Sequence, residues 1–304
     1  MSGLPSHPTR KYTCQWCGHT GEGVELSCPA CGAAVDLKEV VTDSGWEELP
    51  GIRDMAKIQF GKSHCQIEGL YVPVADMNLS PEDWVYFAHH VLLWKDPQVT
   101  VSAMSLKGAW KRMMAGLPII MTAARGPGHI AFSRDQAGEM MALPLQPGQA
   151  VDVREHMMIV ATGQISYDWF QSGIWFNTGS GNDQETHYPL GMYLDRFFAP
   201  QVPGLIILHA AGNCFVRTLG PNESILVKPT ALLFKDPHVR MQLHIEQPAG
   251  NATSWGLFSS TWNQRYLWLR LFGPGRVAVQ SAYKHMEDNG RYITGHSGAS
   301  FRQW

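Results

Sequence analysis

The chain has 304 residues and a formal net charge of −2, so it is long enough for one large domain or for two domains. Because basic charge is not in surplus, the composition argues against nucleic acid as a partner. Charged residues make up 16% of the chain, against roughly 25% in an average soluble domain, and 11 residues are Trp. A composition this poor in charge predicts a subunit interface and hence a homo-oligomer, with one large monomeric core as the alternative.

The sequence contains no segment typical of secretion or of a membrane span. Residues 1–13 are polar and lack the apolar core of a signal peptide. The apolar stretch at residues 113–124 is too short to cross a bilayer and contains Gly116 and Pro118. We therefore expect a soluble, cytoplasmic protein.

The N-terminal region carries two CxxC pairs, each followed by glycine. The four cysteines are Cys14, Cys17, Cys28 and Cys31. This spacing predicts a zinc ribbon over residues 1–36 with a mobile N-terminal arm. Because all four ligands would be thiolates, the Zn²⁺ would be structural and would supply the folding energy of this small module. Two redox-active pairs or a four-cysteine iron–sulfur centre are the alternatives.

The charges of the ribbon favour a protein partner over nucleic acid. Arg10 and Lys11 are offset by Glu22, Glu25 and Asp36, so the ribbon has no basic surface. We therefore expect it to dock on another protein.

An acidic linker at residues 37–50 separates the ribbon from the main domain. In this linker Trp46 either anchors the segment to the main domain or is a tolerated surface side chain. The main domain is expected over residues 51–285 and a flexible tail over residues 286–304. The alternative for the tail is that its terminal aromatic residues dock on a neighbouring subunit.

A proline-led unit occurs three times without a gap, beginning at Pro81, Pro147 and Pro221. Each copy has an apolar run at the same offset, followed by a turn and an alternating strand. The runs are Leu92-Leu93-Trp94, Met158-Ile159-Val160 and Leu232-Leu233-Phe234, and the turns are Asp96-Pro97, Thr162-Gly163 and Asp236-Pro237. Period-two alternation about such turns predicts antiparallel hairpins with one buried face.

A second recurring unit is an apolar strand, a glycine-containing turn and another apolar strand. It spans residues 119–132, 205–216 and 267–279, and a weaker version at residues 56–67 precedes the first proline-led unit. In two copies Pro-Gly suits the central positions of a type II turn. The chain is therefore predicted to be mainly β: a rolled β-sandwich of repeated hairpin units.

Two insertions interrupt the repeats. Residues 105–114 are expected to form a short helical turn that places Lys107, Lys111 and Arg112 beside an apolar patch. Residues 178–188 are a polar loop, and long loops on β scaffolds are common places for binding sites.

Three segments together resemble one family: residues 106–118 leading into residues 126–132, the unit that begins at Pro147, and residues 271–281. They resemble the altered inheritance of mitochondria protein 24 family, with Gly-Pro-Gly-x-Val-x-x-Gln-Ser as the most specific motif. The resemblance implies a fold like that of the tryptophan attenuation protein, a rolled β-sandwich of repeated units that forms rings or other symmetric oligomers. Eukaryotic members are linked to organisation of the mitochondrial inner membrane. The family defines no catalytic residues, and the zinc ribbon and the loop at residues 178–188 depart from its minimal pattern, which suggests an added partner contact.

The thirteen histidines do not form a recognisable catalytic pattern. No His-x-His occurs, and the adjacent His89 and His90 would point to opposite faces of a strand. His209 and Cys214 flank a turn and could form a Cys–His pair, although a core thiol and a turn histidine are the commoner reading. His244 and Glu246 share one strand face, but this pair stands alone. No nucleophile elbow, P-loop or dinucleotide fingerprint is present.

These observations predict a non-enzymatic, oligomeric β scaffold that recruits a protein partner through its zinc ribbon and loops. One alternative is a small-molecule or membrane-surface binder that uses residues 107–124. Another is a hydrolase or metal-dependent enzyme that uses His209, Cys214 or His244. RNA binding would rest on fold kinship alone and conflicts with the net charge.

Overall fold

The structure is a computed structural model. It describes residues 11–13, 19–22, 29–30, 47–48, 58–69, 71–104, 121–179, 181–246, 267–283 and 293–297. The chain divides into two units, Met1–Glu47 and Glu48–Trp304. In the first unit, strands β1 (Lys11–Thr13) and β2 (Thr20–Glu22) form a two-stranded antiparallel sheet, and the short strand β3 (Glu47–Glu48) falls at the boundary.

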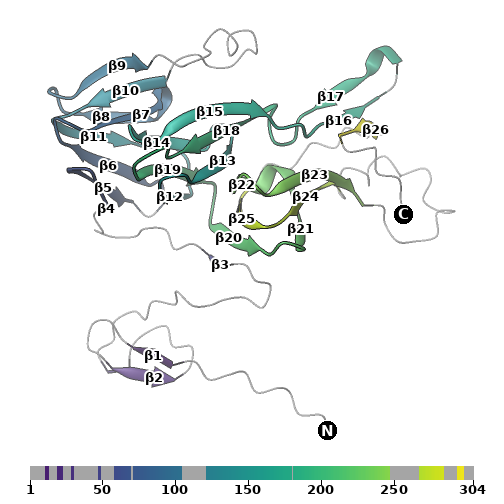
Figure 1. The fold of residues 1–304 in the computed structure, drawn as a ribbon, viewed down its shortest axis with the longest axis horizontal. Helices are drawn as coiled ribbons and strands as arrows, with labels where there is room; N and C mark the ends of the chain where they lie inside the picture. Colours follow the sequence, from purple (N-terminus) through teal and green to yellow (C-terminus); the bar gives the residue numbers. More distant parts are fainter. Residues whose placement is uncertain are drawn as a thin grey trace. The chain divides into compact units, whose positions relative to one another are not determined.

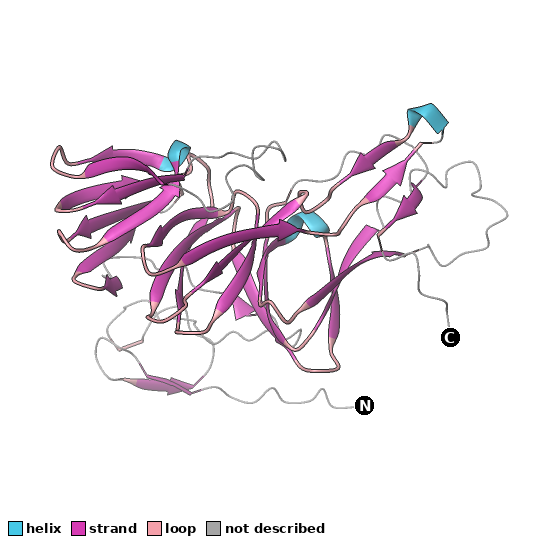
Figure 2. Ribbon diagram, turned by 45° about the horizontal axis from the view of Figure 1, so that its top comes forward, coloured by secondary structure: helices cyan, strands magenta, loops and turns pink. Residues whose placement is uncertain are grey.

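The second unit is mainly β, as the sequence predicts, and its strands recur in three repeats (Figures 1 and 2). Repeat 1 comprises β6 (Val74–Leu79), β7 (Trp84–Ala88), β8 (Leu92–Lys95), β9 (Thr100–Met104), β10 (Met121–Arg125) and β11 (Gly128–Phe132). Repeat 2 comprises β12 (Glu139–Leu145), β13 (Ala150–Arg154), β14 (Met158–Thr162), β15 (Ser166–Gln171), β18 (Tyr193–Phe198) and β19 (Gly204–Ala210). Repeat 3 comprises β20 (Cys214–Leu219), β21 (Ser224–Val227), β22 (Leu232–Lys235), β23 (Arg240–Ile245), β24 (Leu267–Phe272) and β25 (Gly275–Gln280).

The remaining elements lie before, between or after these strands. They are β4 (Ile58–Phe60), β5 (Ser63–Glu68), β16 (Phe176–Thr178), β17 (Glu185–His187), β26 (Ile293–His296) and the 3-10 helices η1 (His89–Val91), η2 (Gly181–Asp183) and η3 (Pro229–Ala231). Within the part of the chain that is described, no helix is long and apolar enough to span a bilayer.

Every repeat pairs its strands in the same way. The second, fifth and fourth strands lie side by side, as in β7-β10-β9, and so do the first, sixth and third strands, as in β6-β11-β8. Each repeat is therefore a small two-layer sandwich. Repeats join where the third strand of one repeat pairs with the second strand of the repeat before it, β14 with β7 and β22 with β13. The resulting sheets have the orders β4-β5-β6-β11-β8 and β12-β19-β14-β7-β10-β9, then the run β15-β18-β13-β22-β25-β20, and β21-β24-β23.

The pairing corrects the prediction of repeated hairpins. The turns after the apolar runs are where the sequence places them, but the strands on either side lie in different sheets: β8 pairs with β11, whereas β9 pairs with β10. The glycine turns at residues 119–132, 205–216 and 267–279 likewise carry the chain from one sheet to another, so β10 and β11 are not partners. The weaker copy at residues 56–67 does form the predicted hairpin, in which β4 pairs with β5. Alternation of apolar residues fixes which face of a strand is buried, but it does not fix which strand lies beside it.

The glycine turns also differ in detail from the prediction. The Gly126–Pro127 and Gly273–Pro274 peptide bonds are cis, in place of the expected type II turns. A Cβ on Gly126 would lie 2.3 Å from the carbonyl oxygen of Ser80, so only glycine fits where the chain crosses between sheets. In repeat 2 the equivalent corner is at Gly204 rather than at Gly212, the glycine of the predicted unit.

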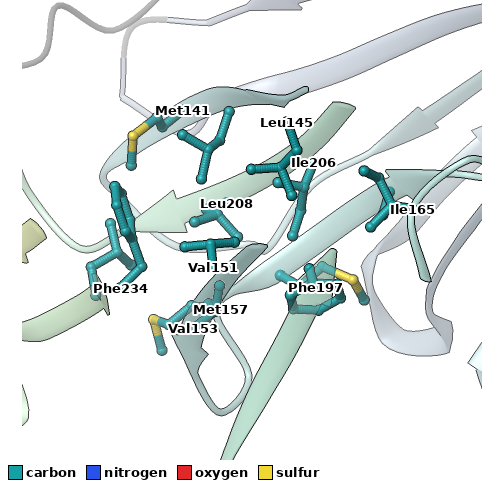
Figure 3. Close-up of a cluster of buried hydrophobic side chains, with 14 of the residues drawn as sticks. Met141, Leu145, Val151, Val153, Met157, Ile165, Phe197, Ile206, Leu208 and Phe234 are labelled. Atoms are coloured by element: carbon teal, nitrogen blue, oxygen red, sulfur yellow. The ribbon is translucent and has the colours of Figure 1, made fainter. Parts of the chain in front are cut away.

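The central strands β7, β14 and β19 of the sheet shared by repeats 1 and 2 are buried on both faces. Phe87 and Val160 belong to one apolar cluster, and Tyr86 and Ala161 belong to a second cluster on the opposite face. Figure 3 shows the second cluster, with Val151 and Phe197 of the next sheet packed against Ile206 and neighbouring side chains. A strand covered on both faces needs a continuous apolar run, which explains the runs of the second and third proline-led units on β14 and β22.

Candidate functional site

The three repeats share one hydrogen bond that ties their two layers together. A side-chain oxygen in the turn after the third strand accepts from the backbone N–H that follows the corner glycine. The pairs are Asp96 Oδ2 with His129 N (2.8 Å), Thr162 Oγ1 with Leu205 N (3.0 Å) and Asp236 Oδ2 with Arg276 N (2.8 Å). Because the gapless alignment equates the three acceptors, Asp96, Thr162 and Asp236, equivalent residues of the proline-led units can be compared across the repeats.

The junctions between repeats also have the same register. Val160 of β14 lies opposite Phe87 of β7, and Phe234 of β22 lies opposite Val153 of β13. The alignment equates Val160 with Phe234 and Phe87 with Val153. A single rule therefore governs how each repeat adds to the one before it.

The junction between repeats 2 and 3 contains a buried charge cluster. Lys235 Nζ lies 2.7 Å from Asp152 Oδ2, and Arg196 Nε lies 2.6 Å from Asp152 Oδ1. The Asp152 side chain is fully buried, and burial lowers the pKa of Lys235 while Asp152 opposes that shift. A buried carboxylate that holds two cations in place restricts the register of the junction.

The junction between repeats 1 and 2 is apolar at the same positions. Tyr86 replaces Asp152, Ala161 replaces Lys235 and Ala123 replaces Arg196. Burial raises the pKa of Tyr86, and among the described residues its hydroxyl has no hydrogen-bond partner. The two internal junctions thus share geometry but differ in chemistry.

The array ends in two strand edges that have no described neighbour on the side used at the internal junctions. We call the free side of β8 in repeat 1 the head edge and the free side of β21 in repeat 3 the tail edge. The consequence for burial is large: Trp94 of β8 is 48% exposed, whereas its equivalents Val160 and Phe234 are 0% and 1% exposed. At the tail edge, Leu226 is 36% exposed. These are apolar, sheet-forming positions without a partner in the described array.

The predicted metal ligands and one of the insertions cannot be compared with the structure. Cys14, Cys17, Cys28 and Cys31 lie outside the described residues, as do Lys107, Lys111 and Arg112. Among the residues that are described, no cluster of three or more His, Cys, Asp or Glu side chains could hold a metal ion.

The surroundings of the candidate catalytic residues His209, Cys214 and His244 indicate a structural role for them. His209 Nε2 lies 3.1 Å from the carbonyl oxygen of Gln136, and burial lowers the pKa of this imidazole. Cys214 is buried on β20 in another sheet, and burial together with Glu139 raises its pKa to about 12. A thiol with so high a pKa is a poor nucleophile near neutral pH. His244 stands on β23 opposite Trp268.

The insertion at residues 178–188 begins at the last residue of β16 and includes β17, and both strands belong to a small sheet of order β17-β16-β26. His187 stacks on Phe176 with ring centroids 4.8 Å apart, and its Nε2 lies 2.7 Å from Thr178 Oγ1. Strand β26, from the segment predicted to be a tail, pairs with β16 of the same chain. Residues 178–188 therefore form an arm held by strand pairing. The last seven residues of the chain, 298–304, lie outside the described range.

Sequence reasoning did not find the two free edges or the charged junction. The relevant signal was present in the aligned repeats, because Lys235 and Asp152 occupy positions whose equivalents at the junction of repeats 1 and 2 are uncharged. That signal has meaning only once the pairing between repeats is known.

Comparisons with known proteins agree with this fold. A model of the family described as mitochondrial biogenesis AIM24 matches residues 65–282. A search of curated proteins finds no match. Seven chains of solved structures match, among them the crystal structure of protein SPYM3_0169 from Streptococcus pyogenes. That structure is similar with a TM-score of 0.52 at 16% identity, over 73% of this chain and 94% of the other, so the likeness concerns the fold alone.

Proposed function

The chain belongs to the AIM24 family, and from that premise we propose that it is a non-enzymatic, oligomeric β scaffold that recruits a protein partner. The scaffold is the rolled array of repeats. The recruiting parts are the N-terminal zinc ribbon, with Zn²⁺ held by four cysteines, and the arm at residues 178–188.

The pair of complementary free edges is the observation that supports self-association. The head edge is the third strand of a repeat and the tail edge is the second strand of a repeat, and these are the partners at both internal junctions. If β8 of one copy adds to β21 of another in the same register, Trp94 lies opposite Val227 and Lys95 lies opposite Leu226. Such an interface is heterologous, so it closes into a ring or continues as a filament.

Burial favours this arrangement. An exposed apolar strand edge is a liability for a protein that stays monomeric, and pairing removes its unsatisfied backbone groups from water. Leu93 and Trp94 would become covered as Ile159 and Val160 are. Pairing between copies would cover part of the surface of each chain. It would therefore account for the low content of charged residues without one large monomeric core.

The four N-terminal cysteines support the recruiting role. With all four positions filled by thiolates, a bound Zn²⁺ has no coordination site for substrate and acts as a structural ion. The proposal includes a cytoplasmic location. The described cysteines, Cys65 and Cys214, are buried free thiols, which is compatible with a reducing compartment.

The test of assembly is the mass of the chain in solution, measured by light scattering after gel filtration. We expect an oligomer, and Trp94→Lys at the head edge should weaken it by at least about 30-fold, since a buried aromatic anchor contributes about 2 kcal/mol or more. Val202→Lys is the matched control, because Val202 is 51% exposed and lies on neither edge. A wild-type chain that is strictly monomeric at all concentrations would refute the proposal.

The test of recruitment is a pull-down from a lysate of the source cell that compares the full chain with a chain lacking residues 1–36. We expect a partner that is retained by the first and lost by the second. Equal retention of the partner by both chains would show that the ribbon does not recruit it.

A further inference from the structure

Two arginines meet at the turn between the second and third strands of repeat 2. Arg134, in the segment between β11 and β12, donates from Nη1 to the carbonyl oxygen of His156 in this turn. Arg154, the last residue of β13, begins the same turn and donates from Nη1 to the carbonyl oxygen of Thr230 in η3. We call Arg134, Arg154 and His156 the cationic cluster.

The two guanidinium groups have no acidic partner. Among the described residues, neither arginine forms an ion pair with a carboxylate. Both are half-buried, burial lowers the pKa of each, and the charge of Arg134 lowers the pKa of Arg154 further. Besides its carbonyl, Arg134 has only a long contact with Met157 Sδ at 3.8 Å within that part of the chain. A guanidinium has five N–H donors, so most of them stay available to a ligand.

The imidazole of His156 is the third member of the cluster, and its side chain is 57% exposed. Burial lowers its pKa, Asp195 opposes that shift, and both arginines add to it. Its Nε2 lies 3.9 Å from Glu155 Oε1, and Asp195 accepts from the Tyr167 hydroxyl at 2.8 Å. These two carboxylates therefore lie near the imidazole, but neither contributes to the pKa shift of an arginine.

The backbone at the cluster has an unusual conformation. Asp135 and His156, with φ of 57° and 68°, are the two non-glycine residues in the left-handed region within the described chain. Asp135 follows Arg134 directly, and His156 supplies the carbonyl that Arg134 binds. In repeats 1 and 3 the equivalents of residues 155–157 form η1 and η3, whereas repeat 2 has no 3-10 helix there. Such conformations cost free energy and concentrate at ligand sites.

The pair of arginines occurs once in the three repeats. The residues that replace them are Ala88 and Lys228 for Arg154 and, counted from the corner glycines, Ala210 and Ser281 for Arg134. A requirement common to all repeats therefore does not explain the pair. Two like charges held close together and withdrawn from water need an anion to offset them.

We propose that the cationic cluster binds the phosphate group of a small soluble molecule. Planar guanidinium groups match phosphate oxygens and hold them through parallel N–H bonds. A phosphate monoester carries about −1.5 to −2 charges at pH 7, which suits two arginines better than the single charge of a carboxylate does. The exposed imidazole of His156 is a further donor to a phosphate oxygen.

The cluster is formed within one chain and includes no residue of the head edge or the tail edge. The proposal therefore does not depend on self-association or on the scaffold function. The competing explanation is that the arginines serve only to bind the carbonyl oxygens of His156 and Thr230. A neutral amide side chain can donate such a bond equally well, so the two explanations predict different results for neutral variants.

The experiment is isothermal titration calorimetry of the full chain with inorganic phosphate at constant ionic strength in chloride. We expect phosphate to bind and acetate to bind more weakly. Arg154→Gln should weaken phosphate binding about tenfold or more, the usual effect of losing a hydrogen bond to a charged group. Arg125→Gln is the matched control, because it removes the same charge from an arginine that lies over the Trp84 ring, and it should have no effect.

Two variants of Arg134 separate its charge from its bond to the backbone. Arg134→Lys and Arg134→Gln can both donate to the His156 carbonyl, but only the lysine keeps the positive charge. We expect Arg134→Lys to bind phosphate several-fold more tightly than Arg134→Gln, with the same circular dichroism spectrum. Equal phosphate binding by these two variants would show that Arg134 serves only the backbone, and the proposal would be wrong.

Bound phosphate should also raise the pKa of His156, measured by nuclear magnetic resonance, because a nearby anion favours the protonated imidazole. Glycerol phosphate identifies the source of the group: tighter binding than that of inorganic phosphate indicates a phosphorylated metabolite, and weaker binding indicates free phosphate. Absence of phosphate binding at millimolar concentration overturns the proposal. Binding that leaves the titration of His156 unchanged also overturns it, because the anion would then lie elsewhere.

Discussion

Lys235 and Asp152 meet across the junction between the second and third repeats, with Nζ 2.7 Å from Oδ2 and both side chains withdrawn from water. The strands that carry them, β22 and β13, belong to different repeats. A buried ion pair is weak evidence for stability, but removing one partner leaves the other charge buried without compensation.

Asp152→Ala should therefore destabilise the chain by about 3–5 kcal/mol, measured as the free energy of unfolding in denaturant. The control is Asp168→Ala at the exposed cross-strand neighbour of Arg196, which should change stability by less than about 0.5 kcal/mol. Combining Asp152→Leu with Lys235→Met should restore most of the loss, since it makes the junction apolar like that of Tyr86 and Ala161. A double variant as unstable as Asp152→Ala would show that packing rather than charge governs this junction.

The sequence predicts the units of this fold better than their connections. The apolar runs and the turns at Asp96, Thr162 and Asp236 are confirmed, because alternation and turn chemistry are local properties of the chain. Pairing is a long-range property: β10 has the pattern of a hairpin partner for β11, yet it lies between β7 and β9.

The sequence does not reveal the candidate interface between copies for a related reason. The runs at Leu92, Met158 and Leu232 are equally apolar, so nothing in them indicates that the first run is exposed and the other two are buried. Only the rule that a third strand pairs with the second strand of the preceding repeat shows that the first repeat has no predecessor. The zinc site stays a prediction, because its cysteines lie outside the described residues.

Stability should fall as the pH drops below about 6.5, in part because of His209. Burial lowers the pKa of this imidazole in the folded chain, the carbonyl oxygen of Gln136 opposes the shift, and Arg134 adds to it. The unfolded chain therefore binds the proton more readily, and the stability present above the ordinary histidine pKa is lost as pH falls toward the folded value. His209→Gln should flatten the decline of the urea midpoint between pH 7.5 and pH 5. An unchanged decline would assign the effect to other groups.

Metal analysis of the purified chain should find one Zn²⁺ per chain, held by the four N-terminal cysteines. Replacing Cys28 and Cys31 with Ser should lower the zinc content to near zero, whereas Cys214→Ala should leave it at one. The far-UV circular dichroism of both variants should retain the β signal, because the repeats have their own core. Iron in place of zinc would point to an iron–sulfur centre instead.

A substitution at the proposed junction between copies can add an interaction instead of removing one. In the proposed register, Lys95 of one copy occupies the position of Lys235, and Leu226 of the other copy occupies the position of Asp152. Arg270 stands where Arg196 stands, so this junction has both cations and lacks the acid between them. Leu226→Asp should supply that acid and tighten self-association by about tenfold or more, since close charge pairs across interfaces contribute about 1.5 kcal/mol or more.

Lys95→Ala alone should have a small effect, but in the Leu226→Asp background it should cancel the gain, because the added carboxylate then loses its partner from the other copy. Dissociation constants from sedimentation of the four chains close a double-mutant cycle that isolates this pair. A gain that persists without Lys95 would mean that the added carboxylate pairs only with Arg270 of its own copy, and the register of β8 on β21 would then be wrong. A coupling of about 1.5 kcal/mol would place Lys95 and position 226 side by side across the interface, which is the arrangement that repeats 2 and 3 already display within one chain.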